Sequence, residues 1–256
     1  MSLRHLADDL GHEVVLSDAP SRVVSLVPSL TEAIALTRPG LLVGATDWCI
    51  EPADLDVTRV RGTKNPNRQT IVDLHPDVVV ANREENRRLD VDELRAAGVQ
   101  VWVTDIDTVE GALTSMRRLL TEALALDAPA WLDDATRVWA APPRLDLEAA
   151  LPIWRDPWMV VGGDTYSSDV LARLGVSNTF AAMEGERRYP KVELADLQRV
   201  PLVILPDEPY AFGPDDGPEC FERSVLVDGR ATAWYGPAMV WARAHLEERL
   251  APHTLG

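Results

Sequence analysis

Apolar and polar residues in the first half of the chain follow a strand-then-helix rhythm. Short apolar, β-branched runs predict strands at 22–27, 41–47, 77–82 and 99–105. Apolar residues at helical spacing predict helices at 28–37, 70–76, 88–99 and 107–126. Ser29 with Glu32 three residues on forms a capping box for the first helix, and Gly98 is a natural C-terminal residue for the third.

The second half resumes this pattern after a further helical stretch, which stops at Pro142 and Pro143. Strands are predicted at 147–154, 157–163, 201–206 and 224–229, and helices at 167–176, 192–200 and 237–250. Gly175 is expected to cap the helix 167–176 at its C-terminal end. Strands that alternate with helices indicate mainly parallel sheets. We therefore predict an α/β fold of two lobes bridged by helix. The predicted limits are 1–107 for the N-terminal lobe, 108–141 for the bridging helical segment and 142–256 for the C-terminal lobe.

Polar and aromatic loops follow several of the predicted strands. Asp47 and Trp48 follow the second strand, and "NREEN" (82–86) ends the third. "GTKN" (62–65) precedes the third strand, and "TDIDT" (104–108) follows the fourth. Because ligands of parallel sheets bind beyond the carboxyl ends of the strands, these loops are expected to line one rim of a cleft between the lobes.

Charge and composition exclude several classes of protein. The 256 residues carry a net charge of −16, and the two dense basic stretches, 83–88 and 187–191, are short. This argues against binding to nucleic acid or to anionic membranes. No apolar run is long enough to span a bilayer, and the first 16 residues lack the apolar core of a secretory signal. A cytoplasmic protein is expected, unless a leader has been removed.

Signatures of catalysis and of metal binding are weak. The chain has no phosphate-binding loop of the GxxxxGK[ST] type, no GxGxxG, no HExxH and no GxSxG motif, and its five histidines are dispersed. "VGGDTYSS" (161–168) could hold an anion, or it could be an ordinary strand-to-helix turn with Asp164 or Ser167 as the cap. Cys49 is expected to be a buried thiol. No metal site is predicted, and no cofactor other than a cobalamin or a metal chelate bound as ligand.

Several segments, taken in order, resemble the class III periplasmic binding proteins, the helical-backbone receptors for cobalamin and ferric siderophores that serve ABC importers. Those that resemble the N-terminal lobe are "RVVSLVPSLTEAIAL", "LVGATDWCIEP", "GTKNPNRQTIVDLHPDVVVA" and "VQVWVTDIDTVEGAL". "MVVGGDTYSSDVLARLGVSNTF", "RYPKVELADLQRVPLVILP" and "SVLVDGRATAWYG" resemble the C-terminal lobe. The resemblance covers about residues 20 to 250 and implies a two-lobed fold with a ligand between the lobes.

The resemblance also assigns individual residues. Trp48 occupies the place of an aromatic that meets the ligand in the cobalamin receptors, and Trp234 with Tyr235 occupies the place of another. Lys64 stands where the family has a further aromatic, which favours an anionic group on the ligand. Gln69 and Ala195 stand where the family has the two glutamates that dock on the permease. This departure predicts a binding protein that works without a permease.

The predicted function is therefore the binding of a bulky, anionic or metal-chelating small molecule. The expected ligand-binding residues are Asp47, Trp48, Lys64, Asn65, Glu84, Glu85, Asn86, Arg155, Asp164, Tyr189, Tyr210, Trp234 and Tyr235. The alternative is an intracellular enzyme in the same cleft, with Asp47, Glu84, Asp105, Asp164 and Glu208 as acids and Lys64, Arg83 and Arg155 as their partners. Turnover distinguishes the two, because a binder returns its ligand unchanged.

Overall fold

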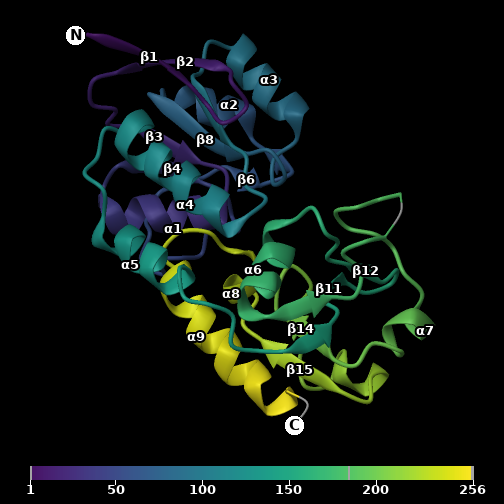
Figure 1. The fold of residues 1–256 in the computed structure, drawn as a ribbon. Coiled ribbons are helices and arrows are strands. Elements are labelled where there is room, and N and C mark those ends of the chain that lie inside the picture. Colours follow the sequence, from purple (N-terminus) through teal and green to yellow (C-terminus); the bar gives the residue numbers. More distant parts are fainter. Residues whose placement is uncertain (1, 184, 255–256) are drawn as a thin grey trace. The chain divides into compact units, whose positions relative to one another are not determined.

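A computed structural model describes residues 2–183 and 185–254 of the chain (Figure 1). The chain forms two compact units. The N-terminal unit comprises residues 1–106, 110–134 and 235–237, and the C-terminal unit comprises 107–109, 135–234 and 238–256. One of the boundaries between the units, at 134/135, falls inside helix α5 (Ala130–Trp139). The lobe limits expected from the sequence stay a prediction.

The N-terminal unit is built on a five-stranded parallel sheet in the order β5-β4-β3-β8-β9. Its strands are β3 (Val23–Ser25), β4 (Leu42–Ala45), β5 (Thr58–Arg59), β8 (Val78–Asn82) and β9 (Val101–Thr104). Every residue of β3, β8 and β9 is buried, which fits apolar runs covered on both faces. The helices of the unit are α1 (Pro28–Thr37), α2 (Arg68–Asp73), α3 (Arg88–Ala96), α4 (Val109–Arg117) and the π-helix η1 (Arg118–Ala123).

Several features of the N-terminal unit differ from the sequence prediction. The predicted capping box at Ser29 is wrong, because α1 begins at Pro28 after Val27 and has no side-chain cap. The residue at the N-cap position is Val27, whose side chain has no hydrogen-bond acceptor, and Pro28 is suited to the first helical position. Helix α2 begins at Arg68, where Asn67 accepts a hydrogen bond from the N–H of Thr70. Two short antiparallel pairs, β1 (Leu3–Ala7) with β2 (Glu13–Ser17) and β6 (Arg61–Gly62) with β7 (Asn65–Pro66), were not predicted.

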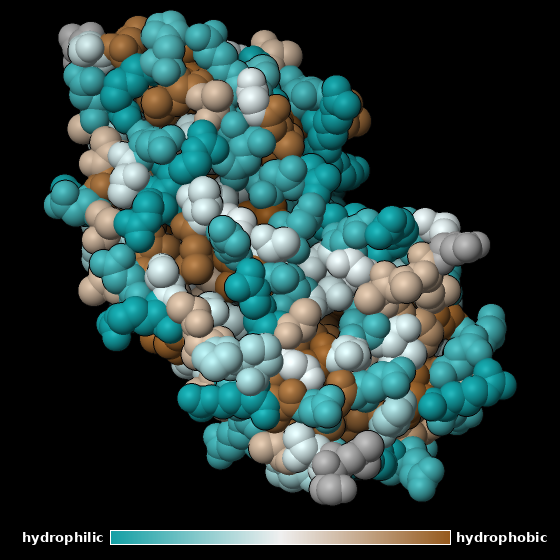
Figure 2. Space-filling model, in the orientation of Figure 1, coloured by the Kyte–Doolittle hydropathy of each residue, from teal (hydrophilic) through white to brown (hydrophobic). Residues whose placement is uncertain are grey.

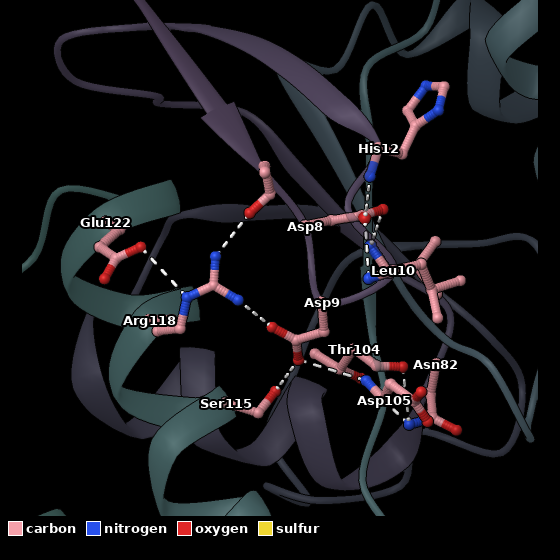
Figure 3. A network of polar contacts seen from close by, with 12 residues as sticks. Asp8, Asp9, Leu10, His12, Asn82, Thr104, Asp105, Ser115, Arg118 and Glu122 are labelled. Atoms are coloured by element: carbon pink, nitrogen blue, oxygen red, sulfur yellow. Dashed lines mark hydrogen bonds and ion pairs between the residues drawn. The ribbon is translucent and has the colours of Figure 1, made fainter.

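Asp9, at the turn of the β1–β2 hairpin, joins this hairpin to the rest of the N-terminal unit (Figure 3). Its carboxylate forms an ion pair with Arg118 and accepts hydrogen bonds from the hydroxyl of Ser115 and the backbone N–H of Asp105. Arg118 also donates to the carbonyl oxygen of Ala7 over 2.5 Å. These contacts attach residues from the beginning of the chain to α4, η1 and the end of β9.

The C-terminal unit contains two parallel strand pairs and one antiparallel pair. The parallel pairs are β10 (Leu147–Ala149) with β13 (Val176–Asn178) and β14 (Val203–Pro206) with β15 (Ser224–Val227). The antiparallel pair is β11 (Pro152–Trp154) with β12 (Met159–Val160). Its helices are α6 (Tyr166–Leu174), α7 (Leu194–Leu197), α8 (Arg230–Ala233) and α9 (Met239–Leu250), with the 3₁₀ turns η2 (Pro218–Cys220) and η3 (Ala251–His253). Helix α6 ends at Gly175 with φ 91°, as the sequence predicts. The predicted α/β class with mainly parallel strands is confirmed.

The visible surface is mostly hydrophilic, with smaller apolar patches between the polar groups (Figure 2), in keeping with a net charge of −16. Over the described ranges, no helix has both the length and the apolar character needed to cross a membrane.

Candidate functional site

The polar loops beside β8 lie together at the carboxyl edge of the N-terminal sheet. The turn of the β6–β7 hairpin carries Lys64, whose Nζ donates a hydrogen bond to the carbonyl oxygen of Glu84 over 2.6 Å. The loop 83–87 that follows β8 carries Glu84, Glu85 and Asn86. Residues that lie 20 positions apart in the sequence therefore meet at one place, which we call the rim. The rim comprises residues 46–50, 61–66 and 82–86.

The side chains of two asparagines, Asn82 and Asn86, hold the rim in its conformation through hydrogen bonds. Asn82 accepts hydrogen bonds at Oδ1 from the N–H groups of Glu84 and Glu85, over 2.8 and 3.2 Å. Asn86 accepts at Oδ1 from the N–H of Asn82, over 2.9 Å. Its Nδ2 donates to the carbonyl oxygens of Leu26 and Thr63, over 3.2 and 3.1 Å. Asn86 is buried and its amide is fully used, so its geometry fits a positioning residue. Sequence reasoning did not single out Asn82, although its place at the end of a buried strand marks it.

Glu85 is half-buried beside a cation and a second carboxylate. Loss of surrounding water raises the pKa of Glu85, the Lys64 ammonium partly offsets this rise, and Glu84 adds to it. The side chain of Lys64 is exposed, so its remaining N–H donors face solvent. The rim thus places the Lys64 ammonium group near a half-buried carboxyl group.

Trp48 is the large aromatic residue of the rim and is 66% exposed. Ile50, two residues on, is 64% exposed. Hydrogen bonds from Arg59 hold the loop 46–50 in place, because its guanidinium group donates to the carbonyl oxygens of Thr46 and Cys49, over 3.1 and 2.8 Å. The Nε1 atom of Trp48 also lies close to Gly62, since a Cβ atom placed on that glycine would come within 3.2 Å of it. The exposed indole therefore lies along the hairpin that carries Lys64.

The other predicted residues of this loop region are accessible or structural. Asp47 and Asn65 are exposed, and the Oδ1 of Asn65 would lie 2.5 Å from a Cβ atom placed on Gly62. Cys49 is fully buried, as predicted, with its Sγ 3.0 Å from the hydroxyl of Thr31, and burial raises the pKa of this thiol. The predicted docking position Gln69 lies on α2, where its amide donates to Asp73 over 2.8 Å.

In the C-terminal unit, Arg155 is enclosed by acids and aromatic rings. It forms ion pairs with Asp216 and with Glu219, the latter over 2.7 Å, and its guanidinium lies 5.6 Å from the Trp158 ring centroid. The hydrogen bond to Glu219 raises the pKa of Arg155 and lowers that of Glu219 to about 2. Tyr210 donates to Asp216 over 2.7 Å, which raises the pKa of its hydroxyl. The guanidinium group of Arg155 and the hydroxyl group of Tyr210 are therefore engaged in bonds to other side chains of the protein.

The "VGGDTYSS" segment is a tight strand-to-helix turn. Cβ atoms on Gly162 and Gly163 would lie 2.0 Å from the carbonyl oxygen of Arg187 and 2.2 Å from that of Ala181. The glycines therefore permit close backbone packing here. The cap of α6 is Thr165, which accepts from the N–H of Ser168, so the expectation of Asp164 or Ser167 is wrong. Asp164 is exposed and pairs with Arg187 over 2.9 Å. Tyr189 is half-buried in the loop before Pro190.

Trp234 and Tyr235 follow α8 and are both buried, at 6% and 5% exposure. Trp234 belongs to the C-terminal unit and Tyr235 to the N-terminal one. Beside Trp234 lies Glu208, whose Oε1 is buried and has no hydrogen-bond partner among the described residues. Burial raises the pKa of Glu208 to about 7, with a contribution from Asp207. Sequence reasoning named Glu208 only as a candidate acid of an enzyme.

Metal-ligating side chains do not converge in the part of the chain that the structure describes. No group of three or more His, Cys, Asp or Glu residues there could hold a metal ion.

Comparisons with known proteins point to one class. No protein-family model matches the chain. The vitamin B12-binding protein of Vibrio campbellii (strain ATCC BAA-1116) is 23% identical over 193 residues, which cover 72% of this chain and 70% of that protein. The periplasmic vitamin B12 binding protein BtuF of Vibrio cholerae has a similar structure, with a TM-score of 0.71 and 17% identity over 91% of this chain and 98% of that one. A periplasmic heme-binding protein from Pseudomonas aeruginosa has a TM-score of 0.73 and 19% identity, over 92% and 94% of the two chains.

These similarities extend over most of the chain in both sequence and structure. They confirm the resemblance to class III periplasmic binding proteins, and the chain has the fold of that class.

Proposed function

We propose that this protein binds a bulky metal chelate of the cobalamin, heme or ferric-siderophore kind at the rim. The observation that carries the proposal is Trp48, an indole that is 66% exposed at the carboxyl edge of a parallel sheet. A large exposed aromatic in this position offers a flat apolar surface to a macrocycle. The vitamin B12-binding and heme-binding relatives support this ligand class.

Charge on the rim favours a ligand with an acidic group. Lys64 is the exposed cation at the turn of the hairpin that Trp48 lies along, and its charge acts on the carboxyl group of Glu85. A carboxylate or another acidic oxygen of the ligand would accept a charge-assisted hydrogen bond from the Nζ of Lys64. The exposed amide of Asn65 offers a second polar contact. Apolar area with a few polar groups is the usual make-up of a small-molecule site.

We propose binding rather than catalysis. Two of the acids that an enzyme would use are already in ion pairs, Asp105 with Arg83 over 2.5 Å and Asp164 with Arg187 over 2.9 Å. The relatives named above are binding proteins by their descriptions. That the protein functions without a permease, and that it is located in the cytoplasm, remain predictions from the sequence.

A screen by isothermal titration calorimetry tests the proposal, with cyanocobalamin, hemin and a ferric hydroxamate chelate as probes. We expect one of them to bind at a 1:1 ratio and to be recovered unchanged. Trp48→Ala should weaken that binding by about 1–3 kcal/mol, the range for losing a buried aromatic contact. The matched control is Trp154→Ala, because Trp154 is 45% exposed but lies in the C-terminal unit. Equal losses in the two variants, or conversion of the probe, would contradict the proposal.

A further inference from the structure

A hollow in the C-terminal unit, remote in sequence from the rim residues, is lined by Arg249 and His253. It has a volume of about 440 Å³. Its walls come from η2, β15, the end of α9 and η3. In Figure 1, β15 and α9 lie next to each other near the C-terminal end of the chain. The residues that line the hollow include the apolar Val225 and Leu226 and the polar Ser224, Arg249 and His253.

Two guanidinium groups lie around His253. Arg249 lines the hollow and donates through Nε to the carbonyl oxygen of Leu226 over 3.0 Å. Arg223 donates to the carbonyl oxygen of His253 over 3.1 Å. Partial burial lowers the pKa of His253, and the charges of Arg223 and Arg249 lower it further. Both guanidiniums are therefore close enough for their charge to act on the imidazole.

Neither arginine is neutralised by an acid in the described part of the chain. Most arginines of this acidic protein lie within 4 Å of a carboxylate, whereas within residues 2–183 and 185–254 Arg223 and Arg249 have no such partner. Their bonds to carbonyl oxygens fix each side chain and leave the terminal N–H groups of Arg249 available. Glu248 is the one acid among the lining residues, and it is exposed.

From this geometry we infer that the hollow binds a small multivalent anion with phosphate or carboxylate groups. Arg249 supplies planar, paired donors of the kind that fit such oxygens. Ser224 adds a hydroxyl, and Arg223 adds long-range attraction. Apolar atoms of the lining residues Val225, Leu226 and Pro252 can contact the carbon part of an organic anion. This site is independent of the rim and of the ligand proposed there.

Inorganic pyrophosphate is the probe that tests the inference, added to the full chain at constant ionic strength. The readout is the imidazole Cε1–H signal of His253 in NMR spectra, assigned with a His253→Gln variant. We expect saturable binding, and a His253 pKa that rises on binding because the anion offsets the two arginines. Pyrophosphate also changes charge with pH, so the linkage is read from a comparison: on going from pH 8 to pH 5.5, its affinity for the wild type should rise relative to its affinity for His253→Gln.

Variants separate a built site from general attraction. Arg249→Gln should raise the dissociation constant at least tenfold, and Arg249→Lys, which keeps the charge, should raise it less. Arg38→Gln is the matched control, because Arg38 is also exposed but lies in the N-terminal unit. If Arg249→Gln fails to fold, Arg223→Gln tests the inference instead, and it should raise the dissociation constant at least threefold. Equal effects of Arg249→Gln and Arg38→Gln, or binding only to vesicles that contain anionic lipid, would overturn the inference.

Discussion

The Nζ atom of Lys64 donates a hydrogen bond to the carbonyl oxygen of Glu84 over 2.6 Å, and so joins the β6–β7 hairpin to the loop that follows β8. The same ammonium group offsets part of the rise in the pKa of Glu85. Lys64 therefore does two things at once: it holds the rim together, and it provides the positive charge that an acidic ligand group would meet.

The chain has two lysines, which makes the role of Lys64 easy to isolate. Lys64→Ala should weaken the binding of an acidic ligand by about 1–3 kcal/mol, the range for a hydrogen bond to a charged group. Lys191→Ala removes the same charge from the C-terminal unit and should leave affinity within twofold. Calorimetry on both variants checks this. An unchanged affinity in Lys64→Ala would remove Lys64 from the site.

Substitutions of Asn86 and Asn65 should differ in their effect on the stability of the protein, although both residues lie on the rim. Asn86→Ala removes three hydrogen bonds of a buried amide and leaves their backbone partners unsatisfied, so it should lower the free energy of unfolding by about 1–3 kcal/mol. Asn65 is exposed, and Asn65→Ala should change stability by less than about 0.5 kcal/mol. Urea unfolding measures both values. A stable Asn86→Ala variant would show that the rim does not depend on this amide.

Glu208 should make stability fall as the pH rises through neutrality. Its pKa is about 7 in the folded chain, above the ordinary value of 4.5, so the folded state holds a proton that the unfolded state releases. The stabilisation is complete below pH 4.5 and is lost as the pH rises through 7. Between pH 5 and pH 8 the wild type should lose about 1–3 kcal/mol relative to Glu208→Gln.

Urea unfolding at the two pH values gives this difference for Glu208→Gln. Glu222→Gln, a change at an exposed carboxylate, is the control and should show the same pH dependence as the wild type. Matching curves for Glu208→Gln and the wild type would mean that the Glu208 carboxyl group ionises normally.

The two cysteines should react at different rates with a thiol reagent. Cys49 is fully buried, whereas Cys220 is half-buried, with its Sγ 3.4 Å from the carboxylate of Glu219. Burial and Glu219 raise the pKa of Cys220, so its reaction should accelerate as the pH increases from 7 to 9. With Ellman's reagent, native protein should show one reactive thiol and unfolded protein two. Two fast thiols in native protein would show that the core around Cys49 opens readily.

The sequence predicted the fold well because strand and helix periods are strong signals. The buried runs of β8 and β9, and the glycine that ends α6, were readable without the structure. The sequence did not show which of several neighbouring residues caps a helix. Ser29 and Asp164 have suitable side chains, but α1 already begins at Pro28 and Thr165 is the residue that caps α6.

The site was predictable only in part. The order of the parallel strands brings their carboxyl ends together, and this places the loops of Trp48 and Glu84 on one rim. The use of each polar group depends on contacts between residues distant in the sequence. Asn86, Arg155 and Tyr210 are polar residues beside loops, as the prediction required, yet their side chains bond to other parts of the chain. No pattern in the sequence distinguishes such a residue from one that faces a ligand.

The position of the ligand is the central claim, and the two lysines allow it to be measured directly. Reductive ¹³C-methylation keeps the positive charge of both lysines and gives each a separate NMR signal, assigned with Lys64→Arg. Addition of the chelate that binds in the calorimetric screen should shift or broaden the Lys64 signal and leave that of Lys191 unchanged. A Lys64 signal that stays unchanged at saturation with the ligand would contradict a binding site at the rim.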